Sequence, residues 1–144
     1  METTVRHIGG VKFVVGTRDH QVICDQPLEN EGEDAGMSPP EFLLASLGTC
    51  AGYYAVQYLK TRSLPTDGLS VRVSAEKSLH PARLSSFRIE VTVPELEARH
   101  IEGVNRAVKS CLIHNTLLNA PVIETVILPA AATVAAGGSK PQSV

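Results

Sequence analysis

The stretch that decides the fold is Ser38-Pro-Pro-Glu-Phe-Leu-Leu-Ala-Ser-Leu-Gly-Thr-Cys50. Ser38 is a favourable N-cap, proline is tolerated in a first helical turn, and Glu41 would lie at the positive end of the helix dipole. Apolar residues then continue to Leu59 on nearly every side, which is typical of a helix that is covered all round. The sequence therefore predicts a long central helix that carries Cys50.

Small side chains surround Cys50 on this helix. Their size either lets another backbone approach closely or leaves room beside the sulfur; they include Ala45, Gly48, Ala51 and Gly52. A cysteine in such a place either fills a tight helix contact or is used chemically, because a free cysteine packs like a small apolar residue. The residues alone leave both interpretations open.

Short β-branched runs precede the helix. The segments 11–15 and 21–24 flank a turn at 16–20, which predicts an antiparallel hairpin. Between residues 25 and 40 the chain is rich in Asp, Glu, Gly and Pro and has no apolar periodicity. This composition predicts a solvated loop that leads into the helix.

Two alternating segments follow the helix, at 69–75 and 86–93, and predict a pair of strands joined through residues 80–83. The segment 100–110 places its apolar residues on one helical stripe, so we expect a second, amphipathic helix there. Cys111 directly follows that helix.

The end of the chain is simpler. Residues 111–118 predict a short further helix, and the apolar run 122–128 predicts a final strand. The segment 130–144 is low in complexity, and we expect a flexible tail. A chain of 144 residues is long enough for one core and too short for two, so residues 1–144 form one α+β domain, with its core at about 11–128.

The composition excludes several classes of function. A net charge of −2 offers no basic field for nucleic acid. The longest apolar runs are shorter than the roughly 20 residues that cross a bilayer, and the N-terminus lacks the regions of a signal peptide. We therefore expect a cytoplasmic protein with neither nucleic acid nor membrane as a partner.

Three scattered cysteines, Cys24, Cys50 and Cys111, form neither a disulfide scaffold nor a Cys-x-x-Cys zinc motif. His114 follows Cys111 by three residues and could share a helix face with it, as a metal ligand or a base. A structural histidine is the simpler interpretation, because two ligands do not make a site. We interpret Cys24, next to Asp25, as structural.

Three blocks resemble the signature of the OsmC/Ohr (organic hydroperoxide resistance) family: Asp25-Gln-Pro, residues 36–50, and Cys111-Leu-Ile-His-Asn-Thr-Leu. The resemblance extends from about Val11 to Leu128. It implies an α+β fold in which antiparallel sheets wrap around a long central helix that bears the cysteine. It also implies an intertwined homodimer with two active sites at the subunit interface.

The same resemblance implies a thiol peroxidase that reduces organic hydroperoxides, and hydrogen peroxide more weakly. Cys50 takes the place of the peroxidatic cysteine and Cys111 that of the resolving one. A dithiol such as a lipoyl group on a protein would return the electrons, with no cofactor or metal. The thiolate must be stabilised by a cation, and the implied pair is Arg18 held by Glu41.

Glu41 stands one residue closer to Cys50 than in the hydroperoxide-resistance branch, and His20 matches many OsmC-like chains. These features place the chain nearer the OsmC-like branch. Arg18 and Glu41 also have simpler interpretations, as a solvated turn residue and as compensation of the helix dipole. The alternative function is an OsmC-like dimer that binds a small ligand or senses oxidants without efficient turnover.

Overall fold

The computed structural model describes residues 1–129. The chain opens with β1 (Thr4–Gly9), β2 (Lys12–Thr17) and β3 (His20–Cys24), which form one antiparallel sheet in the order β1-β2-β3. The predicted β2–β3 hairpin is confirmed, whereas β1 was missed because its polar and apolar residues give no clear run. The expected tail at 130–144 lies outside the described residues.

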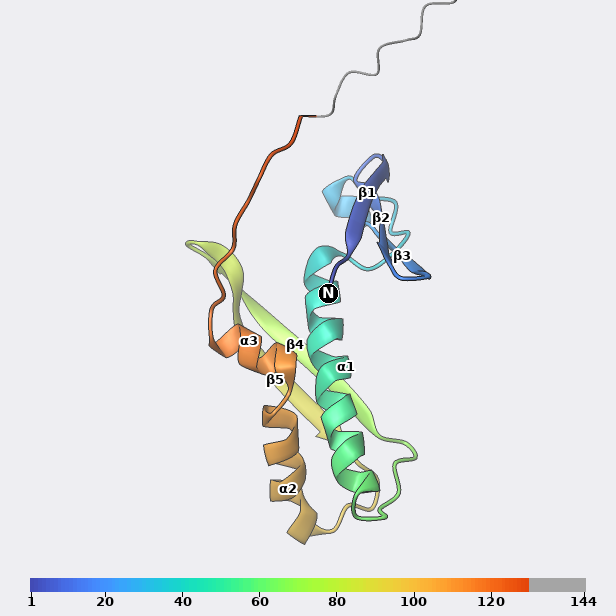
Figure 1. The fold of residues 1–144 in the computed structure, drawn as a ribbon, viewed down its shortest axis with the longest axis vertical. Coiled ribbons are helices and arrows are strands. Elements are labelled where there is room, and N and C mark those ends of the chain that lie inside the picture. The colour runs from blue at the N-terminus through green and yellow to red at the C-terminus, as the bar shows by residue number, and fades with distance from the viewer. Residues whose placement is uncertain (130–144) are drawn as a thin grey trace, which may run out of the picture.

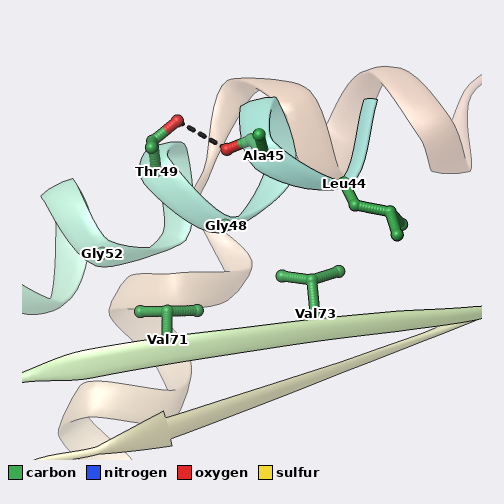
Figure 2. Close-up of a pocket in the computed structure, with 7 residues that line it drawn as sticks. All are labelled: Leu44, Ala45, Gly48, Thr49, Gly52, Val71 and Val73. Carbon is green, nitrogen blue, oxygen red and sulfur yellow. Dashed lines mark hydrogen bonds between the residues drawn. The ribbon is translucent and has the colours of Figure 1, made fainter. Parts of the chain in front are cut away.

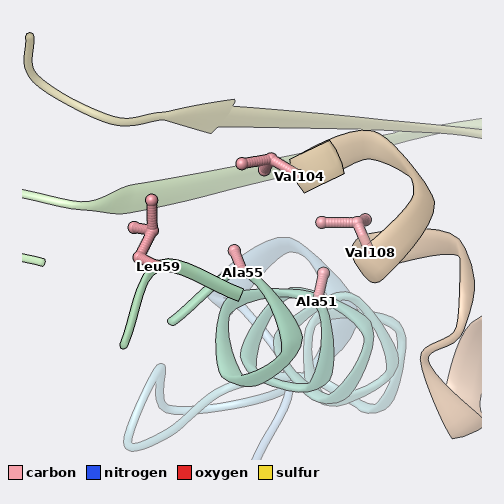
Figure 3. Close-up of a cluster of buried hydrophobic side chains, with 5 residues drawn as sticks. All are labelled: Ala51, Ala55, Leu59, Val104 and Val108. Carbon is pink, nitrogen blue, oxygen red and sulfur yellow. The ribbon is translucent and has the colours of Figure 1, made fainter. Parts of the chain in front are cut away.

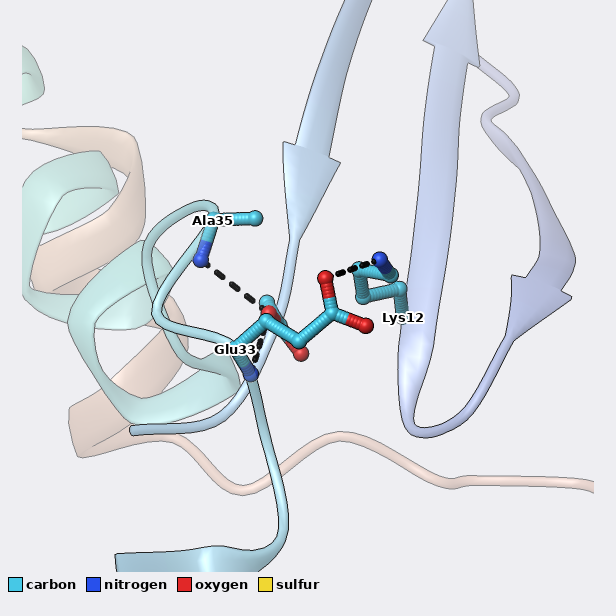
Figure 4. A network of polar contacts seen from close by, with 4 residues as sticks. Lys12, Glu33 and Ala35 are labelled. Carbon is cyan, nitrogen blue, oxygen red and sulfur yellow. Dashed lines mark hydrogen bonds and ion pairs between the residues drawn. The ribbon is translucent and has the colours of Figure 1, made fainter. Parts of the chain in front are cut away.

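The loop after β3 is organised around Asp25 and contains a short 3-10 helix, η1 (Leu28–Asn30). Asp25 is buried, and its Oδ2 accepts hydrogen bonds from the backbone N–H groups of Glu33 and Ala35, both at 3.0 Å. Lys12 of β2 forms an ion pair with the Glu33 side chain at 2.6 Å (Figure 4). Burial acts to raise the pKa of Asp25, but backbone amides, led by that of Ala35, and the Lys12 charge outweigh it and lower the pKa.

Helix α1 (Pro39–Lys60) confirms the predicted long helix. Its start is a capping box, since the Ser38 amide and hydroxyl both donate to Glu41 Oε2 at 2.7 Å. No helix within residues 1–129 is both long and apolar enough to cross a membrane.

The prediction that α1 is covered all round is wrong for the single chain. Its fully buried side chains lie toward the other helices: Leu47, Ala51, Ala55 and Leu59. Tyr53, on another side, is 59% exposed, because no element of the described chain packs over it.

Strands β4 (Ser70–Leu79) and β5 (Ala82–Thr92) form the predicted hairpin, which lies against α1 (Figure 1). Gly48 and Gly52 face this sheet, with Val71 and Val73 of β4 opposite (Figure 2). A Cβ on Gly48 would lie 3.0 Å from Val73 Cγ2, which is closer than real Cβ atoms usually come. The small residues of α1 therefore let β4 approach the helix.

Helix α2 (Ala98–Lys109) packs beside α1 and completes the core. The buried cluster joins the two helices, with alanines on α1 facing valines on α2 (Figure 3): Ala51, Ala55, Leu59, Val104 and Val108. Partly buried side chains of β4 and β5 pack against this cluster. The core is therefore shared by two helices and one face of the hairpin.

A hydrogen bond joins the C-terminal end of α1 to the start of α2. The Tyr58 hydroxyl shares a hydrogen bond of 3.2 Å with His100 Nδ1, and the Arg62 guanidinium lies 3.8 Å above the tyrosine ring. Gly103 leaves the space for this ring, because a Cβ there would overlap the Tyr58 hydroxyl. The position of Tyr58 thus depends on a residue without a side chain.

The short helix α3 (Leu112–Leu118) confirms the third predicted helix. The expected final strand at 122–128 is wrong for the single chain, since this segment is extended but pairs with no strand in the part of the chain that the structure describes. A strand needs a neighbour for its backbone hydrogen bonds, and the segment runs away from α3 and from the helical core (Figure 1). Its apolar side chains are exposed, Val122 by 97% and Ile127 by 85%.

Candidate active site

The α1 and α3 helices bring Cys50 and Cys111 together. Cys50 is half-buried midway along α1, and Cys111, with no exposed surface, directly precedes α3. The Cys111 thiol and the backbone amides of Leu112 and Ile113 lie close enough to the Cys50 sulfur to lower its pKa. Both cysteines are free thiols.

Cys111 is held in place by the helix that it begins. It is the N-cap of α3, with extended backbone angles of φ −60° and ψ 132°. Its Sγ accepts a hydrogen bond from the backbone N–H of His114 at 3.4 Å. The start of α3 therefore orients this sulfur and presents the first amides of the helix to Cys50.

The two thiols differ in how readily they ionise. Burial acts to raise the pKa of Cys50, but the Cys111 thiol and the amides of Ile113 and Leu112 outweigh it and lower the pKa. Burial, reinforced by the neighbouring Cys50, raises the pKa of Cys111. The thiolate is the nucleophilic form of cysteine, so this difference favours Cys50 as the attacking sulfur.

The third cysteine is separate from this pair. Cys24 ends β3 and is only 8% exposed. Its pKa is raised by burial and by the charge of Asp25. A buried thiol with a raised pKa is a poor nucleophile, in keeping with the structural interpretation.

Arg18 and Glu41, the predicted activating pair, are not brought together within one chain. Arg18 lies exposed in the turn between β2 and β3, in a left-handed conformation with φ 52°. Glu41 is engaged by Ser38, whose hydroxyl and amide lower the pKa of this carboxyl. None of the ion pairs among residues 1–129 joins Arg18 to Glu41. Their role stays a prediction.

A pocket of about 570 Å³ lies between α1, α3 and β5, and neither Cys50 nor Cys111 lines it. Leu43 and Leu47 line it and share one face of α1 with Cys50, at the i, i+4 and i+7 positions of a helix. Mostly apolar side chains form the walls: Leu43, Leu47, Arg83, Leu84, Ser85, Phe87, Ile89, His114, Leu117 and Leu118. This pocket was not predicted from the sequence, although the leucine spacing on α1 was a signal.

His114 has a clear place in this arrangement. Its backbone holds Cys111 and its side chain lines the pocket. No group of three or more His, Cys, Asp or Glu residues within residues 1–129 could hold a metal ion. The described residues therefore offer a thiol pair whose helices, α1 and α3, also line a mostly apolar pocket.

The family model described as OsmC-like protein matches residues 32–126, which contain α1, the hairpin and both cysteines. The chain belongs to the OsmC-like family. The resemblance noted in the sequence blocks is thereby confirmed. No functionally curated protein matches the chain.

Solved structures of OsmC-like proteins share the fold. An OsmC-like protein of Mycoplasma pneumoniae aligns with a TM-score of 0.70 at 21% identity, covering 83% of this chain and 87% of that one. A Psychrobacter arcticus protein, provisionally described as an osmotic stress induced and detoxification response protein, aligns at 0.73 and 20% identity over 79% and 85%. The organic hydroperoxide resistance protein OsmC of Legionella pneumophila aligns at 0.59 and 18% identity over 83% and 90%. At these identities the likeness shows the fold, and the predicted α+β OsmC-like fold is confirmed.

Proposed function

We propose that this OsmC-like protein is a thiol-dependent peroxidase that reduces organic hydroperoxides, and hydrogen peroxide more weakly. The observation that carries the proposal is the adjacency of Cys50 and Cys111, with the pKa lowered in one thiol and raised in the other. This asymmetry suits a pair in which the Cys50 sulfur attacks the peroxide as a thiolate while Cys111 remains a protonated thiol until the sulfenic acid has formed. The mostly apolar pocket that α1 and α3 line together with β5 suits an organic substrate.

The proposed reaction proceeds in three steps. The Cys50 thiolate attacks the terminal oxygen of the hydroperoxide, the O–O bond breaks, and the alkoxide takes a proton and leaves as an alcohol. Cys50 is then a sulfenic acid. The Cys111 sulfur attacks it, the S–O bond breaks, and water leaves as a disulfide forms. A dithiol such as a lipoyl group reduces that disulfide by exchange and is itself oxidised.

The proposal includes a homodimer in which a second copy supplies Arg18 to the thiol. In one chain the β1–β3 sheet stands beyond the N-terminal end of α1 (Figure 1), and Arg18 is exposed on it. Tyr53 of α1 and the apolar segment 122–128 are also exposed, so surface suited to a partner is present. In the dimer, Arg18 would stabilise the Cys50 thiolate and Glu41 would orient the guanidinium.

A titration tests the peroxidase cycle. Reduced protein is mixed with cumene hydroperoxide, the new disulfide is mapped by mass spectrometry, and dihydrolipoamide is added. We expect a Cys50–Cys111 disulfide and continued loss of peroxide. Cys50→Ser should abolish turnover, whereas the control Cys24→Ser, which alters a thiol outside the pair, should retain it.

The outcomes separate the two candidate functions. Consumption of a single equivalent without recycling would favour the redox-sensing or ligand-binding dimer. Undiminished turnover by Cys50→Ser would show that the catalytic assignment is wrong.

The shared site has its own test. Arg18→Ala and Cys50→Ser should each be inactive alone, and mixing them should restore activity, because mixed dimers contain one site with both residues intact. No recovery on exchange of subunits would place Arg18 outside the site of the second copy.

A further inference from the structure

The two sulfurs of the proposed disulfide differ in how easily a reducing thiol can reach them. Cys111 has no exposed surface, whereas Cys50 is only half-buried. Cys111 is enclosed by its own chain, so a second copy could add to this burial but could not remove it. A thiol reduces a disulfide by attacking one sulfur and expelling the other, and access is one of the factors that decide which sulfur is attacked. The proposed peroxidase cycle leaves this choice open.

Backbone hydrogen bonds hold Cys111 where α2 passes into α3. Its amide donates to the carbonyl of Val108 at 3.1 Å, and its carbonyl accepts from the amide of Asn115 at 3.0 Å. Its Sγ accepts from the amide of His114 at 3.4 Å. To expose this sulfur, the first turn of α3 must open, which breaks the bonds from His114 and Asn115. Cys50 needs no such opening, because it is already partly exposed on α1.

The chemistry of the leaving group acts in the opposite direction in the reduced protein. The thiol of lower pKa leaves more readily, and here that thiol is Cys50. Burial and the neighbouring Cys50 thiol raise the pKa of Cys111, and the second of these causes disappears once the Cys50 sulfur is bound to the reductant. The amides of His114 and Ile113 still act to lower the pKa of Cys111. Access therefore decides the direction of attack.

Resting on the thiol pair of the proposed function, we infer that the reducing dithiol attacks the Cys50 sulfur and expels Cys111. The S–S bond breaks, its electron pair goes to Cys111 Sγ, which takes up a proton, and a mixed disulfide joins the reductant to Cys50. The second thiol of the reductant loses its proton and attacks the reductant sulfur in this bond. The Cys50 thiolate leaves and the reductant closes its own disulfide, so the pair returns to the state that attacks a peroxide.

A monothiol tests which sulfur is attacked, because it cannot close a ring and the mixed disulfide accumulates. The Cys24→Ser variant is used, so that no third thiol exchanges with the pair, and diamide forms the Cys50–Cys111 disulfide without any peroxide. Mercaptoethanol is then added briefly. N-ethylmaleimide in guanidinium chloride stops the reaction and labels the released thiol, and mass spectrometry maps both groups. We expect mercaptoethanol on Cys50 and maleimide on Cys111, in about tenfold or greater excess over the reverse arrangement, since attack on Cys111 must wait for α3 to open.

The control adds mercaptoethanol to the disulfide protein already unfolded in guanidinium chloride, where both sulfurs are exposed and both arrangements should form in comparable amounts. If the folded protein carries mercaptoethanol mainly on Cys111 or equally on both cysteines, or if unfolding leaves the excess unchanged, the inference is wrong and the peroxidase proposal stands. If the protein reduces no hydroperoxide but its folded disulfide takes up mercaptoethanol on Cys50, the proposed function fails and the direction of reduction stands.

Discussion

The contact between Tyr58 and Gly103 predicts that Gly103→Ala destabilises the protein when Tyr58 is present and stabilises it when the tyrosine ring has been removed. Gly→Ala inside a helix normally stabilises it by about 1 kcal/mol, because alanine loses less backbone freedom on folding. At Gly103 the new methyl group would overlap the Tyr58 hydroxyl, so the ring must move. Overpacking costs about 1–3 kcal/mol, and the hydrogen bond to His100 and the contact with Arg62 are worth about 1 kcal/mol each.

Together these terms, less the gain in helix propensity, predict that Gly103→Ala lowers the free energy of unfolding by about 2–4 kcal/mol. In a Tyr58→Ala background the obstacle is gone, and the same substitution should stabilise the protein by up to about 1 kcal/mol.

Urea unfolding of the four proteins, followed by circular dichroism at one protein concentration, gives the coupling energy directly. A destabilising effect of equal size in both backgrounds would refute the reasoning, because it would show that the tyrosine ring is not what Gly103 accommodates.

Three further predictions concern the site and its support. Cys111→Ala should raise the pKa of Cys50, since the Cys111 thiol is one of the groups that lower it. The reaction of Cys50 with iodoacetamide at neutral pH should slow severalfold, and its rate profile should move to higher pH. An unchanged profile would show that Cys111 does not affect the pKa of Cys50. Asp25→Asn should lower Tm at pH 7, because a carboxyl with a lowered pKa stabilises the fold while it is ionised. The difference in Tm between parent and variant should shrink below about pH 4, as the parent carboxyl takes up its proton. A difference in Tm that does not depend on pH would exclude the charge as its cause. Glu41→Ala should lower Tm more than Glu41→Gln, whose side-chain carbonyl can still accept from the Ser38 amide; equal losses would argue against the capping box.

The helices were predictable from the sequence because their signals are local. The cap at Ser38 lies beside the helix that it starts, and the apolar stripe of α2 repeats within a few residues. The hairpin of β4 and β5 was predictable for the same reason, since its strands adjoin in sequence. Local patterns left the proximity of Cys50 to Cys111 open, because it depends on how α3 packs against α1. Only the family resemblance implied it.

The expectations for Val122–Leu128 and for the covered surface of α1 failed for a related reason. Both depend on neighbours that the described chain does not supply, while composition reports only that a residue is suited to burial. Arg18 is a comparable case. Its sequence context suggested that it stabilises the Cys50 thiolate, but within one chain it lies exposed in a turn between β2 and β3.

Because Cys111 is the N-cap of α3, its oxidation state affects the stability of the fold around this helix. Sulfur is a weak acceptor and cysteine is not among the preferred N-caps, so this helix of seven residues begins on a poor anchor. Helices this short do not persist alone in water. A bond between Cys50 and Cys111 would close a loop of about 60 residues, which in the chain-entropy model is worth about 4 kcal/mol. Oxidation would therefore raise the free energy of unfolding of the chain that contains α3, and each turnover of the proposed cycle would add this stabilisation and remove it again.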